Sequence, residues 1–93
     1  MIVSFADTAT QKVWKRETVK KFGPDLQRLA HRKMTILNAA EYLTDLRRPP
    51  GNRLELLVGD RDGQHSIRVN DQWRICFRWT SAGVADVELV DYH

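Results

Sequence analysis

The sequence predicts an α+β fold in which two N-terminal helices pack on a curved antiparallel sheet, in the order β-α-α-β-β-β-β. Apolar residues recur every three or four positions between residues 25 and 43, as on one helix face. From residue 53 onward they alternate with polar residues, as in strands. Short turns between these strands favour antiparallel hairpins. With 93 residues, the chain is expected to form one domain over residues 1–93.

The first elements are defined by capping and breaking residues. A β-prone run at residues 2–5 precedes a helix whose first amides can be capped by Asp7 or Thr8. We expect this helix to run to residue 22, because Gly23 permits a left-handed cap and Pro24 cannot continue the hydrogen-bond ladder. The segment is therefore predicted as a strand followed by a long helix.

The second helix is expected to begin at residue 25 and to carry its apolar stripe as far as residue 43, interrupted only by Lys33. A proline- and glycine-rich loop is expected at residues 47–52. The remaining chain is predicted to form strands at residues 54–58, 64–69, 72–80 and 84–90, with turns at 59–63, 70–71 and 81–83. The helical pair would cover one face of the sheet and leave the other free for function.

The strand over residues 72–80 has two chemically different faces. One face carries Trp73, Ile75, Phe77 and Trp79, and the other carries Arg74, Cys76 and Arg78. The aromatic row is interpreted as core, the alternative being a platform on which RNA bases stack. Cys76 is expected to be a small buried side chain, although its flanking arginines could favour a thiolate.

Strand pairing identifies an arginine pair on the second face. A hairpin through residues 70 and 71 places Arg68 opposite Arg74, and two such guanidiniums repel unless an anion lies between them. A water-exposed pair is the alternative. A five-residue loop in the next hairpin would place Arg78 opposite Asp86 and Arg74 opposite Val90. Arg74 is therefore the better candidate for binding an anion.

Charge is unevenly distributed along the chain. The net charge is +3 and the pI about 9.4. Residues 1–52 hold ten Lys or Arg against five Asp or Glu, whereas residues 53–93 hold five against seven. Such a field favours nucleic acid or an acidic protein segment, with solvated helix faces as the alternative. Lys20, Lys21 and Arg61 are candidate RNA contacts.

Several classes of function are disfavoured by the composition. A single cysteine excludes an internal disulfide and a multi-cysteine metal site. No phosphate-cradling glycine loop or zinc-ligand spacing is present, so we expect no metal and no cofactor. The sequence also lacks a signal-like start and any apolar run that could span a bilayer. The protein is therefore expected to be cytoplasmic and without membrane contact.

The chain ends in a carboxylate, a phenol and an imidazole at Asp91, Tyr92 and His93. These groups are suited to acid and base chemistry on a phosphodiester, while a frayed surface end is the alternative. Strict alternation puts Tyr92 on the face of Arg74 and its two neighbours on the opposite face. The three side chains can meet one phosphate only if the strand bends or ends there.

Four runs together resemble the HigB-like killer proteins of the RelE/ParE toxin superfamily. They are residues 51–57 (GNRLELL), 59–61 (GDR), 66–78 (SIRVNDQWRICFR) and 87–93 (VELVDYH). The resemblance implies a RelE-like fold and a type II toxin that cleaves translated mRNA in the ribosomal A site. It also implies a helix-turn-helix antitoxin of the HigA type, and operator DNA bound indirectly through the toxin–antitoxin complex.

The resemblance also implies roles for particular residues. The catalytic tail of the family corresponds to Asp91, Tyr92 and His93, and its phosphate-contacting strand arginine to Arg74, with Arg68 as a further contact. Glu55 and Val58 depart from some members, where histidine and lysine occur. Two alternatives are a ParE-like gyrase inhibitor without RNase activity and a weakened toxin that acts as a binding module.

Overall fold

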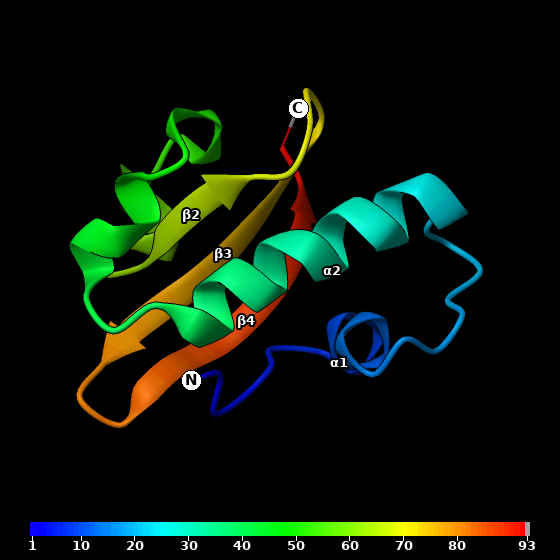
Figure 1. The fold of residues 1–93 in the computed structure, drawn as a ribbon, viewed down its shortest axis with the longest axis horizontal. Coiled ribbons are helices and arrows are strands. Elements are labelled where there is room, and N and C mark those ends of the chain that lie inside the picture. The colour runs from blue at the N-terminus through cyan, green and yellow to red at the C-terminus, as the bar shows by residue number, and fades with distance from the viewer. Residues whose placement is uncertain (93) are drawn as a thin grey trace.

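A four-stranded antiparallel sheet in the order β1-β2-β3-β4 forms the centre of the molecule (Figure 1). The computed structural model describes residues 1–92, and the prediction for His93 lies outside them. The strands are β1 (Glu55–Leu56), β2 (His65–Arg68), β3 (Trp73–Thr80) and β4 (Gly83–Asp91), and the helices are α1 (Thr8–Trp14) and α2 (Pro24–Ala39). The α+β class is therefore confirmed.

The core lies between α2 and one face of the sheet (Figure 1). Ala30, Met34 and Leu37 follow helical spacing and are fully buried, which confirms the apolar stripe of α2. They pack on the row that alternates along β3, where Ile75 and Phe77 are also fully buried. This burial confirms the interpretation of the row as core.

Helix α1 is shorter than predicted, because it ends at Trp14 rather than at residue 22. Arg16 adopts a left-handed conformation (φ 63°), and its N–H donates to the carbonyl of Val13. The N–H of Glu17 donates to the carbonyl of Lys12, which completes a Schellman cap. Glycine usually occupies the left-handed position, so an arginine there gives no sequence signal. Asp7 caps the start of α1, as one of the two predicted residues.

Helix α2 also ends before its predicted limit, at Ala39 rather than at residue 43. The carboxylate of Asp45 accepts hydrogen bonds from the N–H groups of Glu41 and Tyr42, which starts a separate turn. This turn is the 3₁₀ helix η1 (Leu43–Arg47). Two further 3₁₀ helices lie within the predicted loop at 47–52 and the predicted turn at 59–63, namely η2 (Pro50–Asn52) and η3 (Gly59–Arg61). No helix within residues 1–92 has the length and apolar character to cross a membrane.

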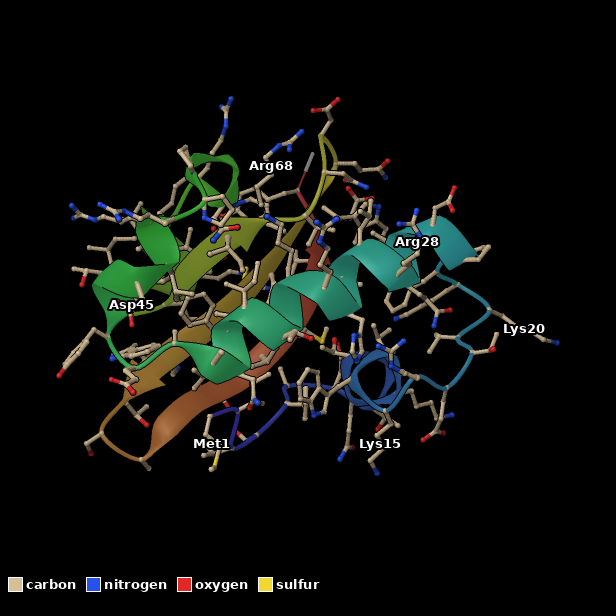
Figure 2. The ribbon with its side chains drawn as sticks, in the orientation of Figure 1. Met1, Lys15, Lys20, Arg28, Asp45 and Arg68 are labelled. Carbon is tan, nitrogen blue, oxygen red and sulfur yellow. The ribbon has the colours of Figure 1, made fainter. Side chains whose placement is uncertain are left out.

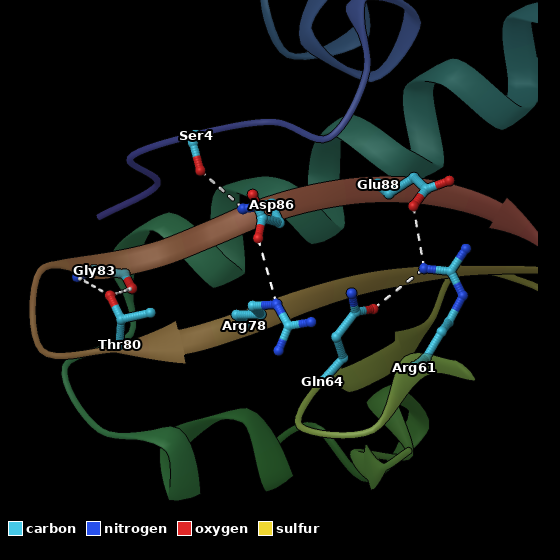
Figure 3. A network of polar contacts seen from close by, with 8 residues as sticks. All are labelled: Ser4, Arg61, Gln64, Arg78, Thr80, Gly83, Asp86 and Glu88. Atoms are coloured by element: carbon cyan, nitrogen blue, oxygen red, sulfur yellow. Dashed lines mark hydrogen bonds and ion pairs between the residues drawn. The ribbon is translucent and has the colours of Figure 1, made fainter. Parts of the chain in front are cut away.

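The N-terminal segment lies along the outer edge of β4 but forms only isolated parallel bridges, Ile2 to Val84 and Phe5 to Val87. The predicted strand at residues 2–5 is therefore wrong as a continuous element. A bulge in β4 interrupts the ladder at Asp86, whose N–H instead binds the hydroxyl of Ser4 at 2.9 Å (Figure 3). The bridges still cover an edge that would otherwise be open.

The β3–β4 hairpin differs from the prediction near its turn. Thr80 pairs directly with Gly83, so the connection has two residues rather than five. Toward the other end the predicted pair of Arg74 with Val90 is confirmed. The bulge accounts for the difference, because Asp86 is the extra residue and adopts φ 54°.

Candidate active site

The sheet face opposite α2 is less open than the sequence suggested. Ser66 and Cys76 on this face are fully buried, and Arg74 is only 9% exposed. The expectation of a free face is therefore wrong, whereas the expectation of a buried Cys76 is confirmed. Burial raises the pKa of the Cys76 thiol against the opposing effect of nearby Arg61, so a thiolate is not favoured.

Arg74 is held in this face by three hydrogen bonds. Its Nε donates to Oγ of Ser66 at 2.8 Å, and its Nη2 donates to the carbonyls of Arg53 at 2.6 Å and Ser66 at 3.3 Å. The Oε2 atom of Glu55 lies 3.9 Å from Nη2. The other amino group, Nη1, donates to none of residues 1–92. The guanidinium is thus fixed on one side while its Nη1 retains donor capacity among these residues.

A pocket of about 340 Å³ lies over this guanidinium. Its lining contains three guanidiniums and two carboxylates. Arg68 pairs with Arg74 across the strands, as predicted, and its guanidinium binds the carboxylate of Asp71. The lining residues are Arg53, Glu55, Arg68, Asn70, Asp71, Gln72, Arg74 and Tyr92. The pocket therefore has an excess of fixed positive charge, which suits an anion such as a phosphate.

Arg53 is a site residue that the sequence did not reveal. It precedes β1 in a left-handed conformation (φ 46°, ψ 58°), where L-residues other than asparagine and aspartate are uncommon. In this position its side chain lines the pocket and its carbonyl holds Arg74. The period-two pattern places Arg53 at the start of a strand and gives no indication of either contact.

Strand β4 ends at Asp91, and Tyr92 directly after it is still tied to the residue before the neighbouring strand β3 by a backbone hydrogen bond. The N–H of Tyr92 donates to the carbonyl of Gln72 at 2.7 Å, and Tyr92 lines the pocket with Arg74. Asp91 is opposite Trp73, and its Oδ2 accepts a hydrogen bond from Nε2 of Gln72 at 3.0 Å, outside the pocket lining. The structure therefore brings Tyr92 to Arg74 and leaves Asp91 at the sheet end. The prediction for His93 lies outside the described residues.

Arg61, at the end of η3, and Arg78, on β3, have structural partners (Figure 3). Arg61 binds Glu88 at 3.1 Å and Gln64 at 3.2 Å. Arg78 lies 3.4 Å from Asp86, so the predicted ion pair forms even though the bulge removes the predicted register. Neither arginine lines the pocket of Arg74.

Two predicted RNA contacts lie away from this pocket. Lys20 and Lys21 are exposed in the connection between the helices, and Nζ of Lys21 lies 5.2 Å from the ring centroid of Phe22. Figure 2 shows Lys20 and Arg68 well apart on the molecule. If Lys20 and Lys21 contact RNA, they would therefore contact a different part of the RNA strand from the part at Arg74. Val58 is 80% exposed and does not line the pocket, whereas Glu55 does.

A separate groove lies between α1 and α2, with a volume of about 660 Å³. Val13 and Ile36 contribute apolar surface, whereas three arginines and a histidine contribute positive or titratable groups. No carboxylate is among the lining residues, which are Val13, Arg16, Gln27, Arg28, His31, Arg32, Thr35 and Ile36. We call this feature the helix groove.

His31, in the helix groove, makes the free energy of unfolding of the protein depend on pH. It stacks on Trp14 with ring centroids 5.2 Å apart, and burial together with Arg16 lowers its pKa below 6.5. On acidification His31 is therefore protonated more readily in the unfolded chain than in the folded chain, which favours unfolding. The contribution of neutral His31 to the free energy of unfolding is complete above pH 6.5 and is lost as the pH falls below that value. We expect the urea midpoint to fall on acidification more steeply for the wild type than for His31→Phe, which keeps a stacked ring. Identical pH dependence in the two proteins would contradict this assignment.

The fold is shared with a solved structure. The YoeB-YefM complex from Staphylococcus aureus matches with a TM-score of 0.64 at 11% identity, over 100% of this chain and 98% of that chain. At this identity the likeness shows the fold alone. A family model described as the RelE-like toxin of the type II toxin-antitoxin system HigB matches residues 3–93. The chain belongs to this family of type II toxins, which confirms the resemblance.

Two relatives match at the level of sequence. Toxin HigB-1 from Vibrio cholerae is 38% identical over 94 residues, which cover 100% of this chain and 98% of that toxin. An uncharacterized protein from Haemophilus influenzae is 36% identical over 73 residues, covering 78% of this chain and 72% of its own length. The match to HigB-1 extends over the segments that form both the pocket and the helix groove.

Proposed function

We propose that this toxin is an endoribonuclease that cuts translated mRNA in the ribosomal A site, without a metal ion. The observation that carries the proposal is the buried guanidinium of Arg74, fixed by Ser66 and Arg53 beneath a pocket that also contains Tyr92. A preorganised cation of this kind stabilises charge that develops on the phosphoryl oxygens of a reacting phosphodiester. Arg68 and Arg53 would hold the neighbouring backbone phosphates.

The reaction needs a base, a cation and an acid. The base removes the proton from the 2′-hydroxyl, whose oxygen attacks phosphorus and forms a 2′,3′-cyclic phosphate as the bond to the 5′-oxygen breaks. The acid returns a proton to the 5′-oxygen, which leaves as a hydroxyl. Tyr92, Asp91 and His93 are the candidates for base and acid, and we favour His93 as the acid because imidazole titrates near neutrality.

The size of the pocket supports a requirement for the ribosome. A volume of about 340 Å³ is at the lower end of small-molecule sites and encloses only a short piece of an RNA strand. Binding and orientation of the codon must then come from elsewhere, and the ribosomal A site supplies both. The proposed partners are consequently the 70S ribosome and its mRNA, and the proposed compartment is the cytoplasm.

The proposal is tested by comparing wild-type protein with His93→Ala on programmed ribosomes and on free mRNA. We expect new 5′-hydroxyl ends within translated codons only when ribosomes are present, and about a 100-fold slower reaction for His93→Ala. Full cleavage by His93→Ala would reject the role of this residue. Inhibition of gyrase supercoiling without mRNA cleavage would favour the ParE-like alternative, and normal growth on expression without antitoxin would favour a binding module.

A type II toxin has an antitoxin as its partner, and we propose that a HigA-type helix-turn-helix antitoxin is the partner here. We assign the helix groove to an acidic segment of that antitoxin. The groove combines an apolar floor with Arg16, Arg28 and Arg32, and no carboxylate from residues 1–92 lines it. An amphipathic segment with carboxylates around apolar anchors is complementary to both features. Operator DNA would be contacted through the antitoxin.

A further inference from the structure

Lys33 on α2 lies outside the lining of the Arg74 pocket but is connected to it through hydrogen bonds and the buried residue Asn52. It is the residue that interrupts the apolar stripe of α2. Its Nζ donates to Oδ1 of Asn52 at 2.6 Å, and Asn52 is fully buried. A buried amide of this kind must have its hydrogen bonds satisfied, so Lys33 and Asn52 constrain each other.

The other end of the Asn52 side chain fixes the segment that precedes β1. Its Nδ2 donates to the carbonyls of Leu46 at 3.2 Å and Arg48 at 3.1 Å. The next residue is Arg53, whose left-handed backbone presents its carbonyl to Nη2 of Arg74 at 2.6 Å. Because Asn52 and Arg53 are adjacent in the chain, a shift of the Asn52 side chain displaces the acceptor that orients Arg74.

We propose that Lys33 is a positioning residue: through Asn52 it holds the Arg53 carbonyl that orients the Arg74 guanidinium in the pocket. The inference rests on the proposed cleavage of RNA by that pocket. The electrostatic surroundings agree with it, since burial, Arg32 and Arg68 lower the pKa of Lys33. Lys33 is thus a cation that lies near other cations. Because its hydrogen-bond partner Asn52 is a neutral amide, this contact does not neutralise the positive charge of the site.

The test is a double-mutant cycle that combines Lys33→Met with Arg74→Lys in ribosome-dependent cleavage. We expect Lys33→Met to slow cleavage about tenfold in the wild type but less than about twofold when Arg74 is already lysine, because its effect passes through that guanidinium. Equal slowing in both backgrounds would show a merely structural role and overturn the inference. Lys12→Met, at an exposed position on α1, is the matched control and should cleave at the wild-type rate.

A second measurement does not depend on activity. In nitrogen-15 NMR spectra, the Nε–H signal of Arg74 should be protected from solvent exchange in the wild type and exchange faster in Lys33→Met. Unchanged exchange would overturn the positioning role. If the wild type does not cleave mRNA at all, the proposed function fails, and this NMR comparison still decides whether Lys33 orients Arg74. Lys33→Gln is carried in parallel as a milder variant, with the same expected pattern, in case Lys33→Met unfolds.

Discussion

Replacing Arg74 by methionine is expected to slow ribosome-dependent mRNA cleavage about 100- to 1,000-fold, the effect of removing a preorganised group that stabilises transition-state charge. Arg74→Lys should lose most of this activity as well. A single ammonium cannot keep the bonds that Nε and Nη2 make to Ser66 and Arg53 while also presenting a donor to a phosphate. The loss should appear in the rate at saturating ribosomes, measured by single-turnover cleavage.

Stability must be measured beside activity, because Arg74 is also a structural residue. Arg74→Met leaves the hydroxyl of the buried Ser66 and the carbonyl of Arg53 without this donor, which costs about 1–3 kcal/mol of unfolding free energy. The assays should therefore be run where the variant is folded by circular dichroism. Arg78→Met is the matched control, since Arg78 is on the same strand but forms a half-exposed ion pair with Asp86. If Arg78→Met were equally inactive, a general loss of positive charge would explain both results.

Those parts of the fold that follow from local periodicity could be predicted from the sequence. The alternation along β3 identified the buried aromatic row, and the register of β2 and β3 correctly paired Arg68 with Arg74. The errors occur where local signals are weak. Arg16 ends α1 without a glycine, and Asp86 adds a residue to β4 without a glycine to mark the bulge. Both positions use a left-handed backbone, which is stabilised at Arg16 by the helix cap and at Asp86 by the hydroxyl of Ser4.

The same distinction applies to the candidate site. Arg74 could be identified because strand pairing depends on turn length and alternation, which the sequence contains. Arg53 and Asn52 could not, because their positions depend on hydrogen bonds to Arg74 and Lys33, which are distant in the chain. Strict alternation predicted that Tyr92 and Asp91 would lie on opposite faces of the sheet. In the structure Tyr92 lines the pocket of Arg74, whereas Asp91 lies outside the pocket lining and binds Gln72. Sequence reasoning thus identified the central cation but not the segment that orients it.

Reversing the charge of the helix groove with Arg28→Glu and Arg32→Glu is expected to weaken antitoxin binding roughly 100-fold, because acidic groups of the partner would face carboxylates. Within residues 1–92 the one ion pair of Arg28 is a long, exposed contact with Asp25 at 3.6 Å, so its charge remains accessible to a partner. Binding of purified antitoxin should be measured by calorimetry at low and high salt. Wild-type affinity should fall as salt increases, and the affinity of the variant should depend less on salt.

The control must separate the groove from the general basicity of the first half of the chain. Lys12→Glu with Lys15→Glu makes the same change in net charge on α1 at exposed positions outside the groove lining. If charge alone attracts the antitoxin, both double variants should weaken binding equally, mainly through the association rate. If the groove is the docking site, Arg28→Glu with Arg32→Glu should also speed dissociation, because an apolar anchor between Val13 and Ile36 would then lie beside repelling carboxylates. Equal dissociation rates in the two double variants would therefore rule out the helix groove as the antitoxin site.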